Sequence, residues 1–314
     1  MRAADAGSAL EAWAAAGARP DAIVLNPPRR GVTPRVRRAV AALAPRRLVY
    51  VSCAPETLAR DLAHLARLGY ATPRVEPYDL LPLTFEVETV AVLAPSAAPP
   101  PRVVHDAGEV WVLDKPPHEP TTPHPDAPSS LLARAQRLAG APDAVAVHRL
   151  DADTSGLVLV ALRPEAAGAW AAALAAGQKT YLALVRGVTR KKGVIRRALA
   201  IDGRSVEAVT RYRRVRVVRG HSLLEVRPQT GRTHQIRRHL AGLGHPILGD
   251  ARYGHAPSNR HLEERYGLDR SFLHAARVEL VTPAGEPLAL AAPLPGDLAV
   301  VLDALDAERP GVRG

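Results

Sequence analysis

Cysteine is almost absent from this chain of 314 residues, since Cys53 is the only one. A single thiol excludes a disulfide within the chain and a metal cluster held by several thiolates. The twelve histidines include no HExxH spacing, so we expect no structural or catalytic metal. The Ala-rich stretch of residues 1–17 is interrupted by Asp5 and Glu11, which argues against a signal peptide or a membrane span. We therefore expect a cytoplasmic protein with no membrane partner.

Positive charge is what the chain has in excess. The formal net charge is +11 and the isoelectric point is near 10.4, and the basic residues are nearly all arginine. The planar guanidinium group suits phosphates, so nucleic acid is the first partner to expect. A GC-rich genome would enrich Ala, Arg, Pro and Gly together in the same way, so this charge alone does not decide the partner.

The first third of the chain alternates short apolar runs with helical patterns. Strands are expected over Ala22–Leu25, Arg47–Ser52 and Glu86–Leu93, and helices over Pro34–Leu43 and Pro55–Leu68. This order predicts a partial doubly wound α/β segment, with ligands beyond the carboxyl ends of its strands.

The length favours two domains. Residues 1–95 form the α/β segment, and the Pro-rich residues 96–102 read as a stiff linker. Residues 103–300 mix helices with mainly antiparallel strands and form an α+β domain, and residues 301–314 are expected to be a C-terminal tail.

The stretch HRLDADTSGLVLVA, residues 148–161, places an acid on a tight polar turn. Apolar runs at Val145–Val147 and Leu157–Ala161 read as buried strands, and the residues between them are dense in turn formers. Asp151 therefore lies on a loop held by a sheet. From composition, its carboxylate is a nucleophile, a general base or a simple turn cap, and turn caps are the common case.

Three segments in this order resemble the RluA-type family of RNA pseudouridine synthases. They are HRLDADTSGL from His148, KTYLALV from Lys179, and RPQTGRTHQIR from Arg227 followed by GHPILGD from Gly244. The resemblance covers about Val103 to Pro295. It implies an isomerase that converts uridines of rRNA or tRNA to pseudouridine without a cofactor, with RNA as the partner.

The resemblance also implies roles for individual residues. Asp151 is the catalytic carboxylate, which either attacks the anomeric carbon or assists proton removal from the neighbouring sugar carbon. Tyr181 lies against the uracil and is a candidate base for a sugar proton, and Arg237 pairs with Asp151. The expected substrate-binding residues are Arg149, which helps to evict the base, and Arg232, Ile247 and Leu248, of which the last two wall the pocket.

Two further patterns in this part of the chain are basic. The run Lys191–Arg197 is either a solvated hairpin tip or a contact to the RNA backbone. A helix is expected from Thr233 to Gly244, with Ile236, Leu240 and Leu243 facing the core.

The α/β segment resembles the C-terminal part of the RNA methyluridine methyltransferases that use S-adenosylmethionine. The resemblance makes Cys53 a nucleophile for the uracil ring and Glu88 the base. However, Asn26 stands where that family has an acid and Ala54 where it has an Asn, and the Gly-rich cofactor turn is missing, because only 25 residues precede Asn26. We therefore interpret the segment as truncated, either a methyltransferase remnant or a fusion whose start codon was called too late. Cys53 and Glu88 are then vestigial, and we expect Cys53 to be a buried structural residue.

Three hypotheses follow. The first is an RNA pseudouridine synthase that acts through Asp151. The second is a non-catalytic RNA-binding protein, which the basic charge favours and the intact motifs oppose. The third is a bifunctional uridine methyltransferase and pseudouridine synthase, which would require binding of adenosylmethionine.

Overall fold

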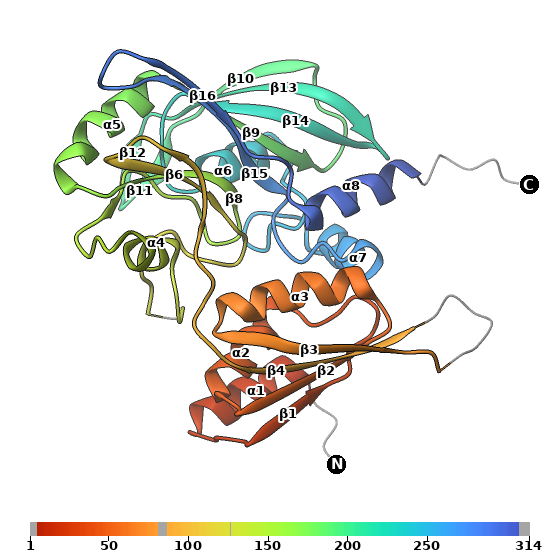
Figure 1. The fold of residues 1–314 in the computed structure, drawn as a ribbon. Coiled ribbons are helices and arrows are strands. Elements are labelled where there is room, and N and C mark those ends of the chain that lie inside the picture. The colour runs from red at the N-terminus through yellow and green to blue at the C-terminus, as the bar shows by residue number, and fades with distance from the viewer. Residues whose placement is uncertain (1–4, 81–86, 126, 308–314) are drawn as a thin grey trace, which may run out of the picture. The chain divides into compact units, whose positions relative to one another are not determined.

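The computed structural model describes residues 5–80, 87–125 and 127–307 (Figure 1). The chain divides into two compact units, Met1–Pro99 and Pro100–Gly314. The division falls inside the Pro-rich segment 96–102. Among the described residues, no helix is both long enough and apolar enough to cross a membrane.

The first unit is a sheet with helices packed on it. Its strands are β1 (Ala22–Leu25), β2 (Arg47–Ser52), β3 (Tyr70–Tyr78) and β4 (Glu88–Pro95). Its helices are α1 (Ala6–Ala15), α2 (Pro34–Leu43) and α3 (Pro55–Arg67). Thr33 caps α2 by accepting from the Val36 N–H at 3.3 Å, and Pro34 occupies the first turn, where the missing N–H costs nothing.

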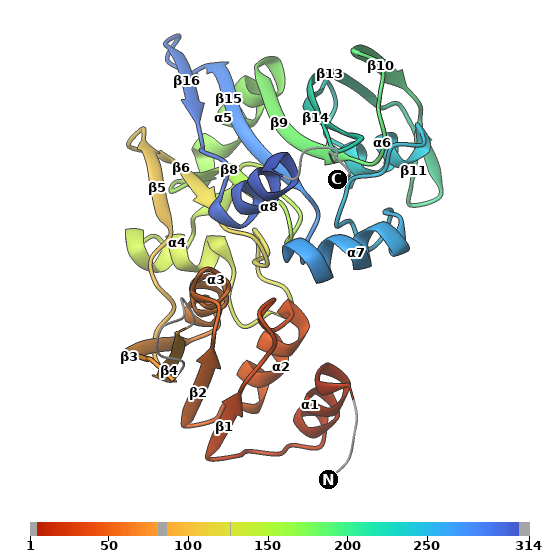
Figure 2. The same cartoon turned by 90° about the vertical axis from the view of Figure 1, so that its right-hand side faces the viewer.

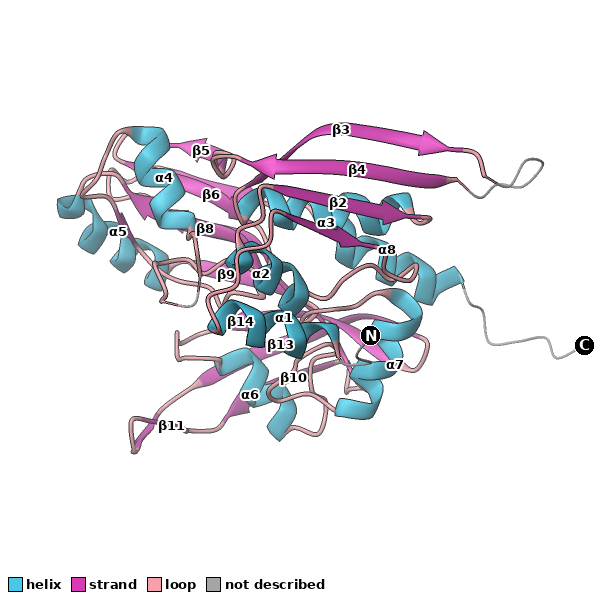
Figure 3. Ribbon diagram, turned by 90° about the horizontal axis from the view of Figure 1, so that it is seen from below, coloured by secondary structure: helices cyan, strands magenta, loops and turns pink. Residues whose placement is uncertain are grey.

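The pairing in this sheet differs from the doubly wound expectation. The strand order is β1-β2-β4-β3, and β1 and β2 are parallel, but β4 is antiparallel to both β2 and β3. The strands β3 and β4 run side by side as a long ribbon (Figure 3). The expected start of the last strand, Glu86, lies outside the described residues. Among the described strands of this sheet, the expected parallel strand–helix–strand arrangement is therefore formed by β1 and β2 alone.

The second unit carries most of the regular structure. Its strands are β5 (Arg102–Asp106), β6 (Val110–Lys115), β7 (Val145–Ala146), β8 (Ser155–Ala161), β9 (Gln178–Val185), β10 (Lys192–Arg196), β11 (Leu199–Ile201), β12 (Arg204–Val206), β13 (Val209–Val218), β14 (His221–Pro228), β15 (Leu273–Val281) and β16 (Pro287–Ala291). Its helices are α4 (Leu131–Ala139), α5 (Pro164–Ala176), α6 (Gln235–Gly242), α7 (Ala256–Tyr266) and α8 (Gly296–Ala307).

A large, mainly antiparallel sheet organises this unit, in the order β10-β13-β14-β9-β15-β8-β6-β5 (Figure 2). The pair β15 and β8 is parallel, and the other pairs along this path are antiparallel. β7 adds to β8 and β16 to β15. The mixed, mainly antiparallel α+β architecture that the sequence predicts for this part of the chain is the one observed.

Strand β8 is buried along its whole length because helices cover both faces of the sheet there. Its residues 157, 159 and 161 pack with Trp170 and Leu174 of α5. Its residues 158 and 160 point the other way and pack with Leu131 and Ala135 of α4. This alternation explains why the strand reads as a continuous apolar run.

Two sequence expectations for this unit were wrong, and one of two alternatives for a third segment is excluded. Residues 301–307, expected to be part of a tail, belong to α8, and its Val301 and Leu305 are buried in the core around β9 and β14. Of the two alternatives for Lys191–Arg197, the hairpin tip does not apply, because strand β10 occupies most of the run and pairs with β13; contact to the RNA backbone stays a prediction. Leu243, expected in the core, is exposed, because α6 ends one residue before it. Residues 308–314 lie outside the described residues.

Candidate active site

Asp151 lies on the loop between β7 and β8, and the backbone of this loop is fixed by side chains from other segments. The Thr121 hydroxyl donates to the Leu150 carbonyl at 2.9 Å and accepts from the Leu150 N–H at 3.0 Å. The fully buried Lys115 ammonium donates to the Ala152 carbonyl at 2.9 Å. These bonds hold the backbone on both sides of Asp151, which positions the carboxylate on a rigid scaffold.

The start of β8 requires glycine. Gly156 has φ +113°, and a Cβ at this position would lie 2.3 Å from the Ala275 carbonyl oxygen of β15. Glycine therefore allows β8 and β15 to pair directly after the Asp151 loop.

Arg237, on α6, joins two carboxylates. Its Nη1 donates to Asp151 Oδ2 at 2.8 Å, and its Nε and Nη2 donate to Asp250 at 2.7 and 2.9 Å. The Asp250 side chain is 1% exposed, whereas that of Asp151 is 29% exposed. Arg237 is thus oriented by a buried carboxylate and presents its remaining N–H groups to an accessible one.

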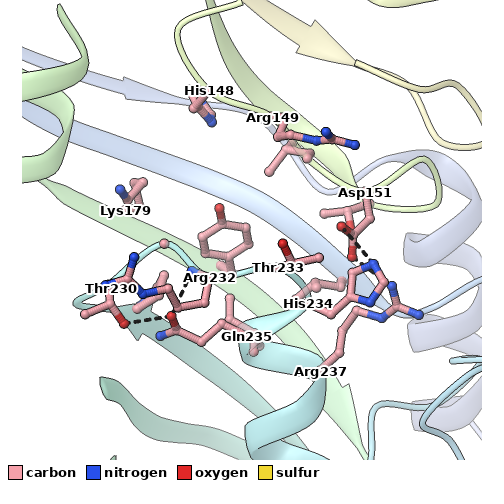
Figure 4. A pocket seen from close by; sticks show the side chains of 17 residues that line it. His148, Arg149, Asp151, Lys179, Thr230, Arg232, Thr233, His234, Gln235 and Arg237 are labelled. Atoms are coloured by element: carbon pink, nitrogen blue, oxygen red, sulfur yellow. Dashed lines mark hydrogen bonds and ion pairs between the residues drawn. The ribbon is translucent and has the colours of Figure 1, made fainter. Parts of the chain in front are cut away.

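The carboxylate of Asp151 faces a pocket of about 390 Å³. In Figure 4, Asp151, His234 and Arg237 come together at one end of this pocket. The lining combines basic, hydroxyl and apolar side chains: His148, Arg149, Leu150, Asp151, Thr154, Lys179, Tyr181, Pro228, Thr230, Gly231, Arg232, Thr233, His234, Gln235, Ile236, Arg237 and Leu273. An accessible carboxylate among cations suits a substrate that carries both phosphates and a reactive carbon centre.

The surroundings of the pocket fix the protonation of three of its groups. Burial and the nearby charge of Asp151 raise the pKa of Tyr181, so its phenol stays protonated at neutral pH. Burial, with a smaller effect of Lys179, lowers the pKa of His148 to about 4, and His148 Nε2 accepts from the Leu159 N–H at 3.2 Å. Burial opposes the charge of Arg237, but its hydrogen bonds to Asp250 and Asp151 raise its pKa above the usual range.

The expected site residues divide into two groups. Arg149 and Arg232 line the pocket, and both are exposed. Ile247 and Leu248 are each 1% exposed and belong to the hydrophobic core around β9, where the Leu248 N–H donates to the Leu184 carbonyl at 2.9 Å. The expectation that these two side chains wall the pocket was wrong, because they face the core.

In the first unit, three expected residues share one edge of the sheet. Asn26 and Cys53 follow the carboxyl ends of the parallel strands β1 and β2, and Glu88 begins β4. Ser52 and Thr89 are partners in the antiparallel register, so Cys53 and Glu88 each lie one residue beyond that pair. Cys53 is half-buried rather than buried, in contrast to the expectation of a buried structural residue.

Several residues of the site were not predicted from the sequence. Asp250 closes the segment GHPILGD, and its position in a known motif was the signal available. His234 and Lys179 also belong to motif segments but were given no role. Thr121 and Tyr253 carry no local pattern, because their partners are 19 to 29 residues away in sequence.

A carboxylate held by an arginine at the edge of a basic pocket, on a large mixed sheet, is typical of an enzyme that acts on a polyanionic substrate. Residues 109–242 match the family described as RNA pseudouridylate synthase. The ribosomal large subunit pseudouridine synthase D of Xanthomonas campestris is 38% identical over 251 residues, which cover 71% of this chain and 75% of that protein.

Two further proteins agree with this match. The tRNA pseudouridine synthase C of Pectobacterium carotovorum is 40% identical over 46% of this chain and 46% of that protein. The structure of human RNA pseudouridylate synthase domain containing 1 aligns with a TM-score of 0.52 and 27% identity, over 66% of this chain and 86% of that chain. The chain belongs to the family of RNA pseudouridine synthases, which are isomerases.

Proposed function

We propose that the second unit isomerises specific uridines in structured rRNA or tRNA and that Asp151 is the catalytic carboxylate. The observation that carries this proposal is the Asp151 carboxylate itself, which faces the pocket with Oδ2 bound to Arg237 at 2.8 Å. The relatives named for the large ribosomal subunit and for tRNA support these two classes of RNA. Since both are substrates inside the cell, we expect the enzyme to act in the cytoplasm.

The reaction needs no co-reactant, because its product is an isomer of its substrate. The bond between N1 of uracil and C1′ of the ribose breaks, the bond between C5 and C1′ forms, C5 loses its proton and N1 gains one. Asp151 either attacks C1′ or assists removal of the proton at C2′. Arg237 orients Asp151 in both routes, because the pair places a fixed positive charge 2.8 Å from one carboxylate oxygen.

The uridine must leave its stack to reach Asp151. Arg149 is exposed at the pocket and projects from the same loop as Asp151, so it is positioned to fill the gap left by the base. Tyr181 lines the pocket and packs against the uracil in this proposal. Its raised pKa favours packing and hydrogen-bond donation over the role of a base. Arg232 and Lys179 supply positive charge for the neighbouring phosphates.

For the first unit we propose a methyltransferase-like segment whose chemical residues are vestigial. The support is the shared sheet edge of Asn26, Cys53 and Glu88. Calorimetry with adenosylmethionine tests this proposal, and we expect no binding. A measured affinity, together with methylation that Cys53→Ala abolishes, would instead favour a bifunctional enzyme.

The test of the isomerase proposal is quantification of pseudouridine in RNA digests by nucleoside chromatography. The purified chain is incubated with rRNA and tRNA from cells that lack the modification. We expect pseudouridine from the wild type and none from Asp151→Asn, which keeps the size of the side chain and removes its charge. Equal RNA binding by both proteins without any product from the wild type would favour a non-catalytic RNA-binding protein.

A further inference from the structure

Asp151 contacts a second side chain besides Arg237. His234 directly precedes α6, and its Nε2 lies 3.6 Å from Asp151 Oδ1, the oxygen that Arg237 does not bind. The backbone of His234 has φ +54°, in the left-handed region that non-glycine residues rarely adopt. Strained backbone of this kind is often retained at functional sites, and here it brings the imidazole to the carboxylate.

The other imidazole nitrogen is bound by Tyr253. His234 Nδ1 lies 3.0 Å from Tyr253 Oη. If Nδ1 carried the proton, the lone pair of Nε2 would face the Asp151 carboxylate, which is unfavourable. The phenol therefore donates to Nδ1, and Nε2–H points at Asp151. The separation of 3.6 Å is one that a small rotation of either side chain closes when substrate binds.

Tyr253 is itself held by the residue that orients Arg237. Asp250 Oδ1 accepts from the Arg252 and Tyr253 N–H groups at 2.9 and 3.0 Å, in addition to its bonds with Arg237. The Arg237 and Arg252 guanidinium groups lie 5.2 and 5.4 Å from the centre of the Tyr253 ring. One buried carboxylate thus fixes both partners of Asp151, Arg237 directly and His234 through Tyr253.

We propose that His234 and Tyr253 are positioning residues that form a second, titratable arm on Asp151. This inference rests on the proposed catalytic role of Asp151. In the neutral state, His234 directs an N–H to Asp151 Oδ1 and holds the carboxylate plane without adding charge. Once protonated, His234 adds a second cation beside Arg237, which makes the carboxylate a weaker nucleophile and base. The rate of isomerisation therefore falls as His234 gains its proton.

Burial is the main cause that favours the neutral state of His234 at pH 7. Burial lowers its pKa, and the cations Arg237 and Arg252 lower it further, while Asp151 and Asp250 act in the opposite direction. The Tyr253 hydroxyl also favours the neutral imidazole, since a donor at Nδ1 can bind only the unprotonated nitrogen. Removal of this hydroxyl raises the pKa of His234.

The experiment is the pH dependence of the single-turnover rate between pH 5 and 9. Tyr253→Phe keeps the ring beneath the guanidinium groups and removes the hydroxyl alone. In this variant we expect the acid limb, the fall of the rate at low pH, to move to higher pH by about 0.5 to 1 unit, which is the effect of one hydrogen bond. We expect His234→Gln, which keeps an N–H donor and cannot gain a proton, to lose this limb and to be faster than His234→Ala. Tyr266→Phe on α7, whose hydroxyl contacts Arg265, is the matched control and should keep the wild-type profile.

An NMR titration of the imidazole provides a readout that does not depend on activity. Tyr253→Phe should raise the pKa of His234 and weaken its preference for a proton on Nε2. An unchanged pKa and an unchanged acid limb in this variant would overturn the inference even if Asp151→Asn is inactive. If Asp151→Asn isomerises uridine at the wild-type rate, the proposed function itself fails.

Discussion

Arg237→Lys is the substitution that separates positive charge from geometry at the site. Arginine binds Asp151 and Asp250 at once through three N–H groups, at 2.7 to 2.9 Å. An ammonium group is a point charge without this fork and cannot bridge the two carboxylates in the same way. Because Asp250 is 1% exposed, we expect the lysine to stay with Asp250 and to release Asp151.

The magnitude follows from the bonds that are lost. A hydrogen bond to a charged group contributes about 1.5 to 3 kcal/mol, so loss of the Asp151 contact should slow isomerisation by about 10- to 150-fold. The ion pair with Asp250 is weakened but not broken. The free energy of unfolding should therefore fall by about 1 to 3 kcal/mol, which is less than the loss expected when one partner of a buried ion pair is removed.

The assay is the single-turnover rate at saturating enzyme, with a urea titration of each protein for stability. Arg238→Lys is the matched control, because Arg238 is the next residue of α6 and binds the Ala200 carbonyl on the exposed side. We expect it to keep the wild-type rate. A rate for Arg237→Lys within twofold of the wild type, in a folded protein, would refute the role given to this guanidinium group.

Three further predictions concern the support of the site. Lys115→Met should lower the free energy of unfolding by about 2 to 4 kcal/mol, measured by urea titration, because the Pro116, Glu119 and Ala152 carbonyls lose a buried donor. The isomerisation rate should fall as well. Gly156→Ala should reduce the melting temperature by several degrees, because its Cβ would lie 2.3 Å from a carbonyl oxygen; an unchanged melting temperature would contradict the strand contact. Burial opposes ionisation of Asp250, but Arg237 and two backbone N–H groups hold its pKa below the usual value. The ionised Asp250 therefore stabilises the fold above its unfolded pKa of about 4, and this stabilisation is lost as the pH falls through the pKa of the folded protein. The difference in free energy of unfolding between the wild type and Asp250→Asn, measured by urea titration, should therefore shrink below about pH 4.

The sequence predicts most of the elements that build the pocket because their signals are local. The fully buried β8 appears as an unbroken apolar run, and α2 has Thr and Pro at its start. β3 was not predicted, since charged residues and two prolines interrupt its alternation and it forms only because β4 lies beside it. Residues 301–307 of α8 were expected to be part of a tail, although Val301 and Leu305 are buried in the core.

The sequence motifs predicted part of the site, namely the residues to which the resemblance assigns a role. The pairing of Arg237 with Asp151 was expected from the resemblance, and the two side chains are in contact. The role of Asp250 needed the structure, because its position next to Arg237 depends on the turn that follows the core residues Ile247 and Leu248. The apolar character of those two residues suits a pocket wall and a core equally well, so the sequence alone could not separate the two.

Release of tritium from RNA labelled at C5 of uracil tests the central claim most directly, since C5 loses its proton when the new bond forms. We expect release by the purified chain without any cofactor, no release by Asp151→Asn, and no change with Cys53→Ala. Release that requires adenosylmethionine and disappears in Cys53→Ala would contradict the account and assign the chemistry to the first unit.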